Sequence, residues 1–232
     1  MFRWRSLSVR IGFLITLSLL LLGCVSSTNT AREQTRASGD FSRDQVAKKS
    51  RRAAKIESDG AYGFTLSEIV RIDSDVRRDY QRGISLLESG QLEAGVEVLE
   101  SVVERAPEVT NPYIDLGIAY GRLNRHAEAE ASLSSALSLS PNHPAALNEL
   151  GIVQRRTGRF EAARASYERA LSIHPGFHFA LLNLGVLCDL YLHDLACAHE
   201  SYSRYAEIVR GDREVTIWLS DVQSRLDQAN RE

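Results

Sequence analysis

The sequence lacks the common signatures of an enzyme. Its 232 residues contain no phosphate-binding glycine loop, no Gly-x-Ser-x-Gly nucleophile motif and no His-Glu-x-x-His metal motif. Lysine is absent after Lys55, and the chain has only three cysteines and five prolines. We therefore expect a protein without enzymatic activity and without a cofactor.

A long apolar run is also missing, apart from one short segment near the N-terminus. Residues 11–22 read IGFLITLSLLLL, twelve residues without a charge that follow three arginines. A membrane-spanning helix needs about 20 apolar residues, so this segment is typical of a secretory signal peptide. It ends in LLGC, which resembles the lipobox of bacterial lipoproteins. The resemblance implies a signal peptide over residues 1–23 and a lipid on Cys24, with a plain secretory signal or an uncleaved anchor as alternatives.

The residue after Cys24 indicates which membrane the lipid would occupy. It is Val25 rather than an aspartate. By the same resemblance, this implies the outer membrane, with the folded part facing the periplasm. Two or more acyl chains would make the attachment stable, because each buried methylene contributes about 0.8 kcal/mol.

Without that leader the chain holds 25 basic and 30 acidic side chains, unevenly distributed. Residues 25–60 hold eight basic and five acidic groups, and residues 61–232 hold 17 and 25. We expect no nucleic-acid partner for an exported domain that is net negative. Residues 24–63, poor in large apolar side chains, are expected to form a disordered basic linker. Its run KKSRRAAK, residues 48–55, either contacts anionic lipid or a partner, or is simply solvated.

The segment FTLSEI predicts that ordered structure begins with a helix near Phe64. Thr65 and Glu68 have the spacing of a capping box, and Phe64 and Ile69 have that of a hydrophobic staple. Apolar residues then recur at three- and four-residue steps as far as Leu87. We therefore expect one long amphipathic helix at the start of the folded part.

A 34-residue repeat dominates the rest of the chain. Gly-Ile or Gly-Val dipeptides begin at Gly83, Gly117, Gly151 and Gly185, and prolines recur at Pro107, Pro141 and Pro175. With Tyr120, Ala129 and Tyr167, these residues resemble the tetratricopeptide repeat in type and spacing. The resemblance implies an all-α, right-handed superhelical solenoid. Four repeats fit residues 64–212, in frames 76–109, 110–143, 144–177 and 178–212, and residues 213–229 predict a C-terminal capping helix.

The repeat pattern also predicts how each hairpin is built. The glycine of the first helix is expected to meet a small residue of the second, such as Ala129 or Ala163, so that the backbones approach closely. Gly90, Asn124 and Gly158, again 34 apart, are residues that accept the left-handed conformation that ends a helix. In the fourth frame the pattern slips by one residue before it resumes at Ala198.

One cluster of metal-ligating residue types lies in the fourth frame. Cys188, His193, Cys197 and His199 suggest zinc, but their spacing matches no compact zinc motif, so we expect no metal. A disulfide between Cys188 and Cys197 is possible in an oxidising compartment, and two reduced, buried cysteines are the alternative.

The family register places certain first-helix residues on the concave face of the solenoid. The resemblance implies a protein-binding groove there, lined by Tyr80, Ile84, Ile114, Ile118, Asn148, Ile152, Arg155, Leu182, Val186 and Asp189. The row of Ile84, Ile118, Ile152 and Val186 would suit an apolar segment of a partner, or these residues merely add to the core. Repeats of this family that bind the carboxylate ends of chaperones use lysines and asparagines, whereas these positions hold tyrosine and isoleucine, so we expect no chaperone clamp.

Together these features predict a lipid-anchored, non-enzymatic adaptor for envelope proteins. The chain resembles the tetratricopeptide lipoproteins of pilus systems, of the pilotin and Tad types, which assist outer-membrane secretins. Its last repeat also resembles repeat proteins of TonB–ExbB-type energy-transducing systems, and an adaptor for peptidoglycan hydrolases is a third possibility. An enzyme or metal-dependent sensor built on the Cys/His cluster is the rival from a different class. Repeats specify a fold far better than a partner.

Overall fold

The computed structural model describes residues 55–58, 64–67 and 72–231. The leader, Cys24 and most of the predicted linker lie outside the described residues. In the part of the chain that the structure describes, no helix has both the length and the apolar content needed to cross a membrane.

The first described element is a hairpin of two short strands. Strand β1 (Lys55–Ser58) pairs antiparallel with β2 (Phe64–Ser67), so that Ile56 lies opposite Leu66. The prediction of a helix starting at Phe64 is therefore wrong, and residues 55–58 of the expected disordered linker are in a strand. The capping signals are local, whereas Phe, Thr and Ile favour strands when a partner strand is available. The first described helix, α2, begins at Ser74.

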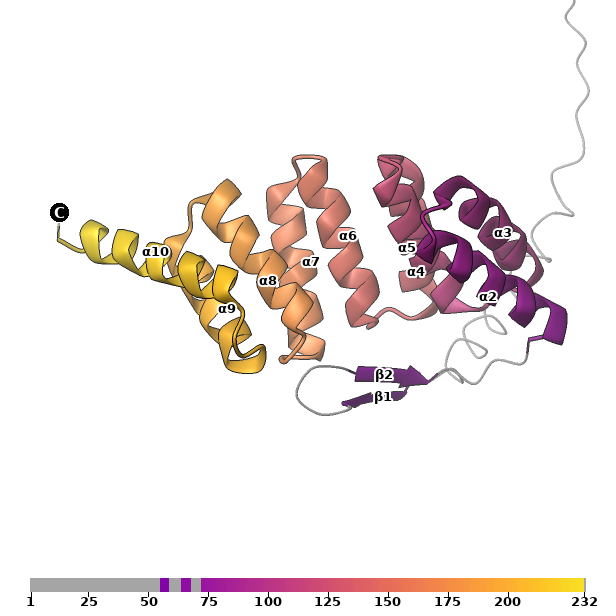
Figure 1. Cartoon of the computed structure of the whole chain (residues 1–232), viewed down its shortest axis with the longest axis horizontal. Helices are drawn as coiled ribbons and strands as arrows, with labels where there is room; N and C mark the ends of the chain where they lie inside the picture. The colour runs from indigo at the N-terminus through magenta and orange to yellow at the C-terminus, as the bar shows by residue number, and fades with distance from the viewer. Residues whose placement is uncertain (1–54, 59–63, 68–71, 232) are drawn as a thin grey trace, which may run out of the picture. The chain divides into compact units, whose positions relative to one another are not determined.

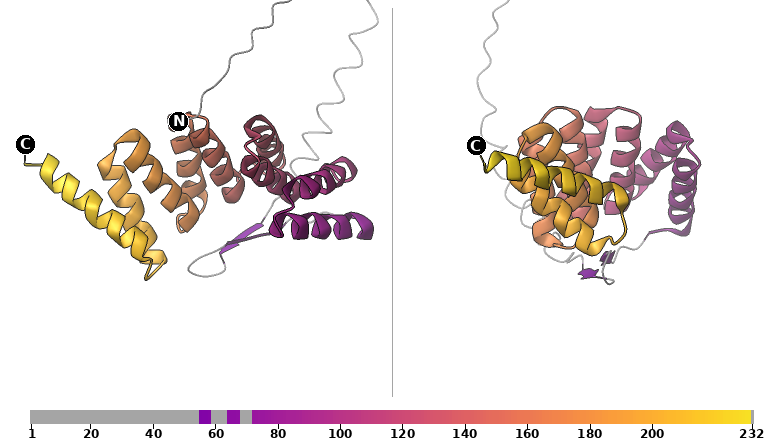
Figure 2. Two further views of the ribbon diagram at one scale, coloured as in Figure 1. Left: turned by 45° about the horizontal axis from the view of Figure 1, so that its top comes forward. Right: turned by 60° about the vertical axis from the view of Figure 1, so that its left-hand side comes forward.

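The rest of the described chain is a row of helical hairpins, stacked in sequence order (Figures 1 and 2). This arrangement confirms the predicted all-α fold of stacked helix pairs. The elements are α2 (Ser74–Glu88), α3 (Leu92–Arg105), α4 (Thr110–Arg122), α5 (His126–Leu139), α6 (Pro144–Arg156), α7 (Phe160–Ile173), α8 (His178–Leu187), η1 (Cys188–Leu192), α9 (Leu195–Ile208) and α10 (Arg213–Ala229). Each even-numbered helix from α2 to α8 is the first of its pair, and α10 packs on α9.

The turns inside the hairpins have the predicted left-handed residues. Gly90, Asn124 and Gly158 have φ of 81°, 59° and 77°. The fourth hairpin uses His193 instead, with φ of 53°, and the sequence pattern did not identify it. A non-glycine residue in this conformation costs about 1–2 kcal/mol, so His193 is held there by its surroundings.

Each repeating glycine packs against a large side chain of the second helix, not a small one. A Cβ added at Gly185 would lie 2.5 Å from Cδ1 of Tyr202, and one at Gly117 would lie 2.5 Å from Cγ of Leu133. The prediction that each glycine meets a small residue of the second helix is therefore wrong. Ala129 and Ala163 are fully buried, but the residue over each glycine is the one four positions further along the second helix. These pairs are Gly83–Leu99, Gly117–Leu133, Gly151–Tyr167 and Gly185–Tyr202.

The one-residue slip in the fourth frame has a structural form. Helix α8 continues directly into η1, a π-helical turn over Cys188–Leu192, before the chain turns at His193. A π-turn takes up one extra residue without breaking the helix. This is why Gly185 and Tyr202 are 17 residues apart, whereas Gly151 and Tyr167 are 16 apart.

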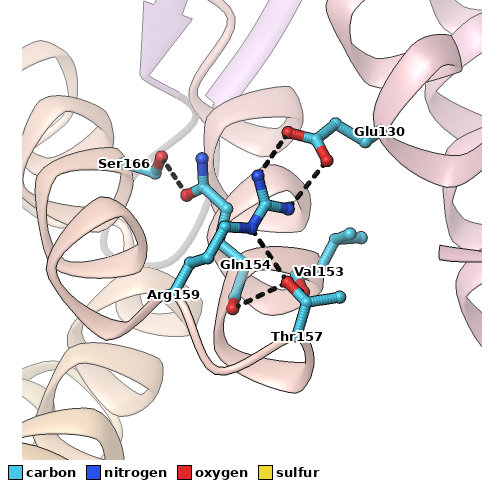
Figure 3. Close-up of polar contacts among 6 residues, drawn as sticks. All are labelled: Glu130, Val153, Gln154, Thr157, Arg159 and Ser166. Carbon is cyan, nitrogen blue, oxygen red and sulfur yellow. Dashed lines mark hydrogen bonds and ion pairs between the residues drawn. The ribbon is translucent and has the colours of Figure 1, made fainter. Parts of the chain in front are cut away.

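Polar contacts fix neighbouring repeats against each other (Figure 3). The guanidinium of Arg159, at the start of α7, donates to both carboxylate oxygens of Glu130 in α5, at 2.8 and 2.7 Å. Within the same hairpin, Ser166 donates to the side-chain oxygen of Gln154 at 2.7 Å, and both residues are buried. Such contacts help to hold the hairpins in a stack, and the stack is needed because a single hairpin cannot bury its apolar face alone.

Candidate protein-binding face

The ten predicted groove residues all lie on first helices of the hairpins or on η1. We call the surface that they form the first-helix face. Helix α4 contacts α6, and α6 contacts α8, so this face is continuous across the repeats. Ile114, Asn148 and Asp189 are buried, and the other seven residues are half-buried. The groove itself stays a prediction.

The residues of the apolar row on the first-helix face are partly buried by packing within the protein. Ile118 packs against one buried core cluster, and Ile152 and Val186 pack against another. Each therefore contributes to stability as well as to the surface. A substitution at these positions changes folding and surface together, so more exposed residues make better probes of binding.

Hydrogen bonds join adjacent first helices along this face. The Tyr80 hydroxyl donates to Oδ2 of Asp115 at 2.6 Å, and Nδ2 of Asn183 donates to Oδ1 of Asn148 at 3.0 Å. Asn148 also donates to Glu149 at 3.1 Å. Tyr80 and Asn148, predicted as partner contacts, thus also tie the repeats together.

Two carboxyl groups on the same face are largely shielded from water. Burial raises the pKa of Asp115, although the Tyr80 hydroxyl bond partly opposes the shift. Burial likewise raises the pKa of Glu149, against the bond from Asn148 and the charge of Arg156. Asp115, Glu149 and Asn183 are spaced by 34 residues, so sequence reasoning had the signal that they share one position of the repeat.

Arg155 has unusual surroundings for an arginine. Its guanidinium carbon lies 5.7 Å from the centroid of the Tyr191 ring, and that ring lies 4.8 Å from Phe160. Tyr167 adjoins it on the core side, and burial raises the pKa of Tyr167 to about 12 although the positive charge of Arg155 opposes the shift. Burial lowers the pKa of Arg155, but its interactions with the hydroxyls of Tyr167 and Tyr191 outweigh burial and raise it.

Large apolar side chains are exposed at the C-terminal end. Phe179, Leu190 and Ile217 are 55%, 61% and 67% exposed, with Tyr191 and Trp218 exposed beside them. Phe179, Leu182, Val186 and Leu190 follow one another along α8 and η1 at three- and four-residue steps. They therefore extend the first-helix face. Sequence reasoning missed Phe179, Leu190 and Ile217. A signal existed for Ile217, which lies 35 residues after Leu182, that is, one 34-residue repeat plus the extra residue of the fourth frame.

The fourth hairpin also contains the disulfide. Cys188, in η1, is bonded to Cys197, in α9, and their Cα atoms lie 5.9 Å apart. Both thiols are consumed by this bond. Over residues 55–58, 64–67 and 72–231, no three His, Cys, Asp or Glu side chains are grouped to hold a metal ion.

A hollow of about 580 Å³ lies between the second helices α7 and α9. Its charged side chains are paired with one another: Arg164 lies 2.9 Å from Glu168 and 3.1 Å from Asp194, and Arg204 lies 3.6 Å from Glu200. The hollow is therefore electrostatically satisfied within the chain.

Comparisons with known proteins support the fold that the geometry shows. Residues 114–176 match the family model described as "Tetratricopeptide repeat". No curated protein sequence matches the chain. The fold of the helical part is that of a tetratricopeptide-repeat protein.

Three solved structures illustrate the likeness. MamA (residues 41 to the end) from Desulfovibrio magneticus is 19% identical, with a TM-score of 0.60, over 68% of this chain and 88% of MamA. PilF of Pseudomonas aeruginosa is also 19% identical, with a TM-score of 0.60, over 66% of this chain and 69% of that structure. The Thermus thermophilus protein TTC0263 is 21% identical, with a TM-score of 0.58, over 65% and 82%. At such identities the likeness concerns the fold alone.

Proposed function

We propose that this protein is a non-enzymatic adaptor, anchored by a lipid on Cys24 to the outer membrane, that binds an envelope protein through its first-helix face. The observation that carries the proposal is the distribution of exposed apolar side chains. In the described part of the chain, the large ones gather on α8, η1 and α10, next to the half-buried Leu182 and Val186. An exposed apolar patch on a soluble domain favours a protein-binding surface.

The anchor and the system are inferred from the sequence. The leader with its LLGC ending supports lipidation, and the resemblance to pilotin and Tad-type lipoproteins favours a role in pilus or secretin assembly. PilF of Pseudomonas aeruginosa shares the fold. A TonB–ExbB-type component or a peptidoglycan hydrolase as the captured partner would assign the adaptor to another envelope system.

The binding proposal is tested with exposed residues. Phe179→Glu combined with Leu190→Glu should abolish recovery of the crosslinked partner while helix content, measured by circular dichroism, is unchanged. Ala131→Glu is the matched control, because Ala131 is exposed on the second helix α5. Normal partner recovery by the double variant would show that the first-helix face is not the binding surface.

The anchor is tested separately. Cys24→Ser should move the protein from the membrane fraction to the soluble fraction, and the N-terminal peptide of the native protein should carry the mass of fatty acyl chains. Unmodified Cys24 in the membrane fraction would contradict the lipid anchor.

A further inference from the structure

The fourth hairpin lacks a contact that the second and third hairpins have. At the end of α4, Arg122 donates to the carbonyl oxygen of Leu87 at 3.4 Å. At the end of α6, Arg156 donates to that of Gly121 at 2.6 Å. The next position of this 34-residue series is Leu190, which cannot form such a bond and is 61% exposed. This position of the repeat therefore changes from holding neighbouring hairpins together to presenting an apolar side chain.

Leu190 lies in η1, and the carbonyl of Cys188 closes this turn. It accepts hydrogen bonds from the backbone N–H groups of His193 and Asp194, the latter at 2.9 Å. The bond from His193 spans five residues and defines the π-helical turn. Such turns are rare, and His193 has a left-handed φ of 53°, so this backbone persists only where its surroundings fix it.

The disulfide supplies such a constraint at the start of the turn. Cys188 is fully buried and is bonded to Cys197 in α9. The start of α9 is itself held in place: the side chain of Asp194 accepts from the Cys197 N–H at 3.0 Å and lies 3.1 Å from Arg164 in α7. The crosslink therefore joins the first residue of η1 to a second helix that is tied to the preceding hairpin.

The residues between the crosslink and His193 reach the surface. Tyr191 is 39% exposed, and its ring centroid lies 4.8 Å from that of Phe160 and 5.7 Å from the guanidinium carbon of Arg155. These contacts hold the ring in one orientation. Leu190 and Tyr191 are thus ordered before a partner arrives, and ordered groups lose little conformational freedom on binding.

We propose that the Cys188–Cys197 disulfide is a positioning element of the partner-binding surface. It holds η1 in the π-helical turn that presents Leu190 and Tyr191, so partner binding depends on the oxidation state of this cysteine pair. This role rests on the proposed adaptor function, and it assigns the irregular turn of the fourth hairpin to recognition rather than to stability alone.

The first measurement needs no partner. The native full chain, purified in detergent and labelled with 3-fluorotyrosine, is followed by fluorine NMR, with Tyr191→Phe used to assign the Tyr191 signal. Dithiothreitol then reduces the disulfide: two electrons and two protons pass to Cys188 and Cys197, and the dithiol closes to its cyclic disulfide. The Tyr191 signal should move toward that of a solvent-exposed tyrosine and return on reoxidation. An unchanged signal would overturn the proposal.

The second measurement follows the partner in the cell. A photo-crosslinking amino acid at position 179 forms the adduct, and Cys188→Ala combined with Cys197→Ala should lower the adduct yield at least about fivefold, because η1 must then be ordered on binding. Gly117→Ala is the matched control. Its added methyl overlaps Leu133 in the second hairpin, so it destabilises the fold away from η1 and should leave the yield unchanged.

The outcomes separate this role from the adaptor function. If the double-alanine variant keeps the native adduct yield, the disulfide serves stability alone and the proposal is wrong, whereas the binding face stands. If Gly117→Ala lowers the yield as much, general destabilisation explains the loss and the proposal is again wrong. If the native protein forms no adduct at position 179, the proposed function fails, and the positioning role fails with it.

Discussion

The second and third hairpins differ from the fourth in ways that separate folding from recognition. Helices α4–α7 follow a strict 34-residue spacing, turn at Asn124 and Gly158, and from Ile114 on fall within the range matched by the family model. The fourth hairpin holds an extra residue in η1, turns at His193 and is crosslinked by a disulfide. It also exposes Phe179 and Leu190.

This difference teaches which residues the fold requires. Where packing alone decides, the glycine and the buried aromatic or leucine recur at the same interval. The fourth hairpin departs from that interval. It also exposes apolar side chains that do not belong to the buried core. Departures of this kind are expected at functional sites, since a local rule is broken there without a packing gain.

Loss of the disulfide should have the largest effect on stability. Cys188→Ala combined with Cys197→Ala removes a crosslink between residues nine positions apart. By the chain-entropy relation, a crosslink over this separation stabilises the folded state by about 2–3 kcal/mol. The free energy of unfolding in urea should fall by that amount, and hydrogen exchange should rise in α8 and α9 before it rises in α4 and α5. Uniform exchange along the whole chain would show that the fourth hairpin does not depend specially on its crosslink.

The glycine positions separate packing from helix propensity. Gly151→Ala should destabilise the protein by about 1–2 kcal/mol, because the added methyl overlaps the Tyr167 ring and overpacking outweighs the gain in propensity. Gly121→Ala is the control: no atom lies within 4 Å of its added Cβ. This control should stabilise by about 0.5–1 kcal/mol, measured by urea unfolding. Equal effects at the two sites would contradict the packing explanation.

The turn residues test the irregular hairpin directly. His193→Gly should stabilise by up to about 1 kcal/mol, because glycine adopts the left-handed conformation without strain. Gly158→Ala, in the regular third hairpin, should destabilise by about 1 kcal/mol. Differential scanning calorimetry would measure both, and a loss of stability in His193→Gly would indicate that the imidazole itself is needed.

The smallest effect concerns pH. The folded-state pKa of Glu149 is raised by burial, so the folded protein binds more protons than the unfolded chain above the ordinary glutamate pKa of about 4.3. Stability should therefore decrease as pH rises from that value through the raised pKa. Glu149→Gln should flatten this part of a stability curve measured by urea unfolding, and an unchanged slope would mean that Glu149 titrates normally in the fold.

The sequence predicted the repeats well because their rules are local. Each repeated residue type meets a requirement of the backbone at its own position. These are the glycines at a constant interval, the left-handed residues Gly90, Asn124 and Gly158, and the prolines after the second helices. The size of the residue over each glycine was predicted wrongly, because Tyr167 and Ala163 both lie on the buried side of α7 and only the packed structure shows which one covers Gly151.

Tertiary context decided the other errors. The residues from Phe64 on carry local helix signals, but they pair as a strand with residues 55–58, which the sequence pattern had assigned to the linker. Helix α10 packs on α9, and Phe179 and Leu190 stay exposed, which no local pattern encodes. Arg155 was assigned to the groove by register, but its aromatic neighbours Tyr167 and Tyr191 are known only when the surrounding side chains are placed.

The most direct test of the account places a photo-crosslinking amino acid in the living cell. At position 179, on the first helix of the fourth hairpin, it should form a covalent adduct with one envelope protein. At position 131, exposed on the second helix α5, it should form none. Adducts at 131 and not at 179 would contradict the claim that the first-helix face holds the partner.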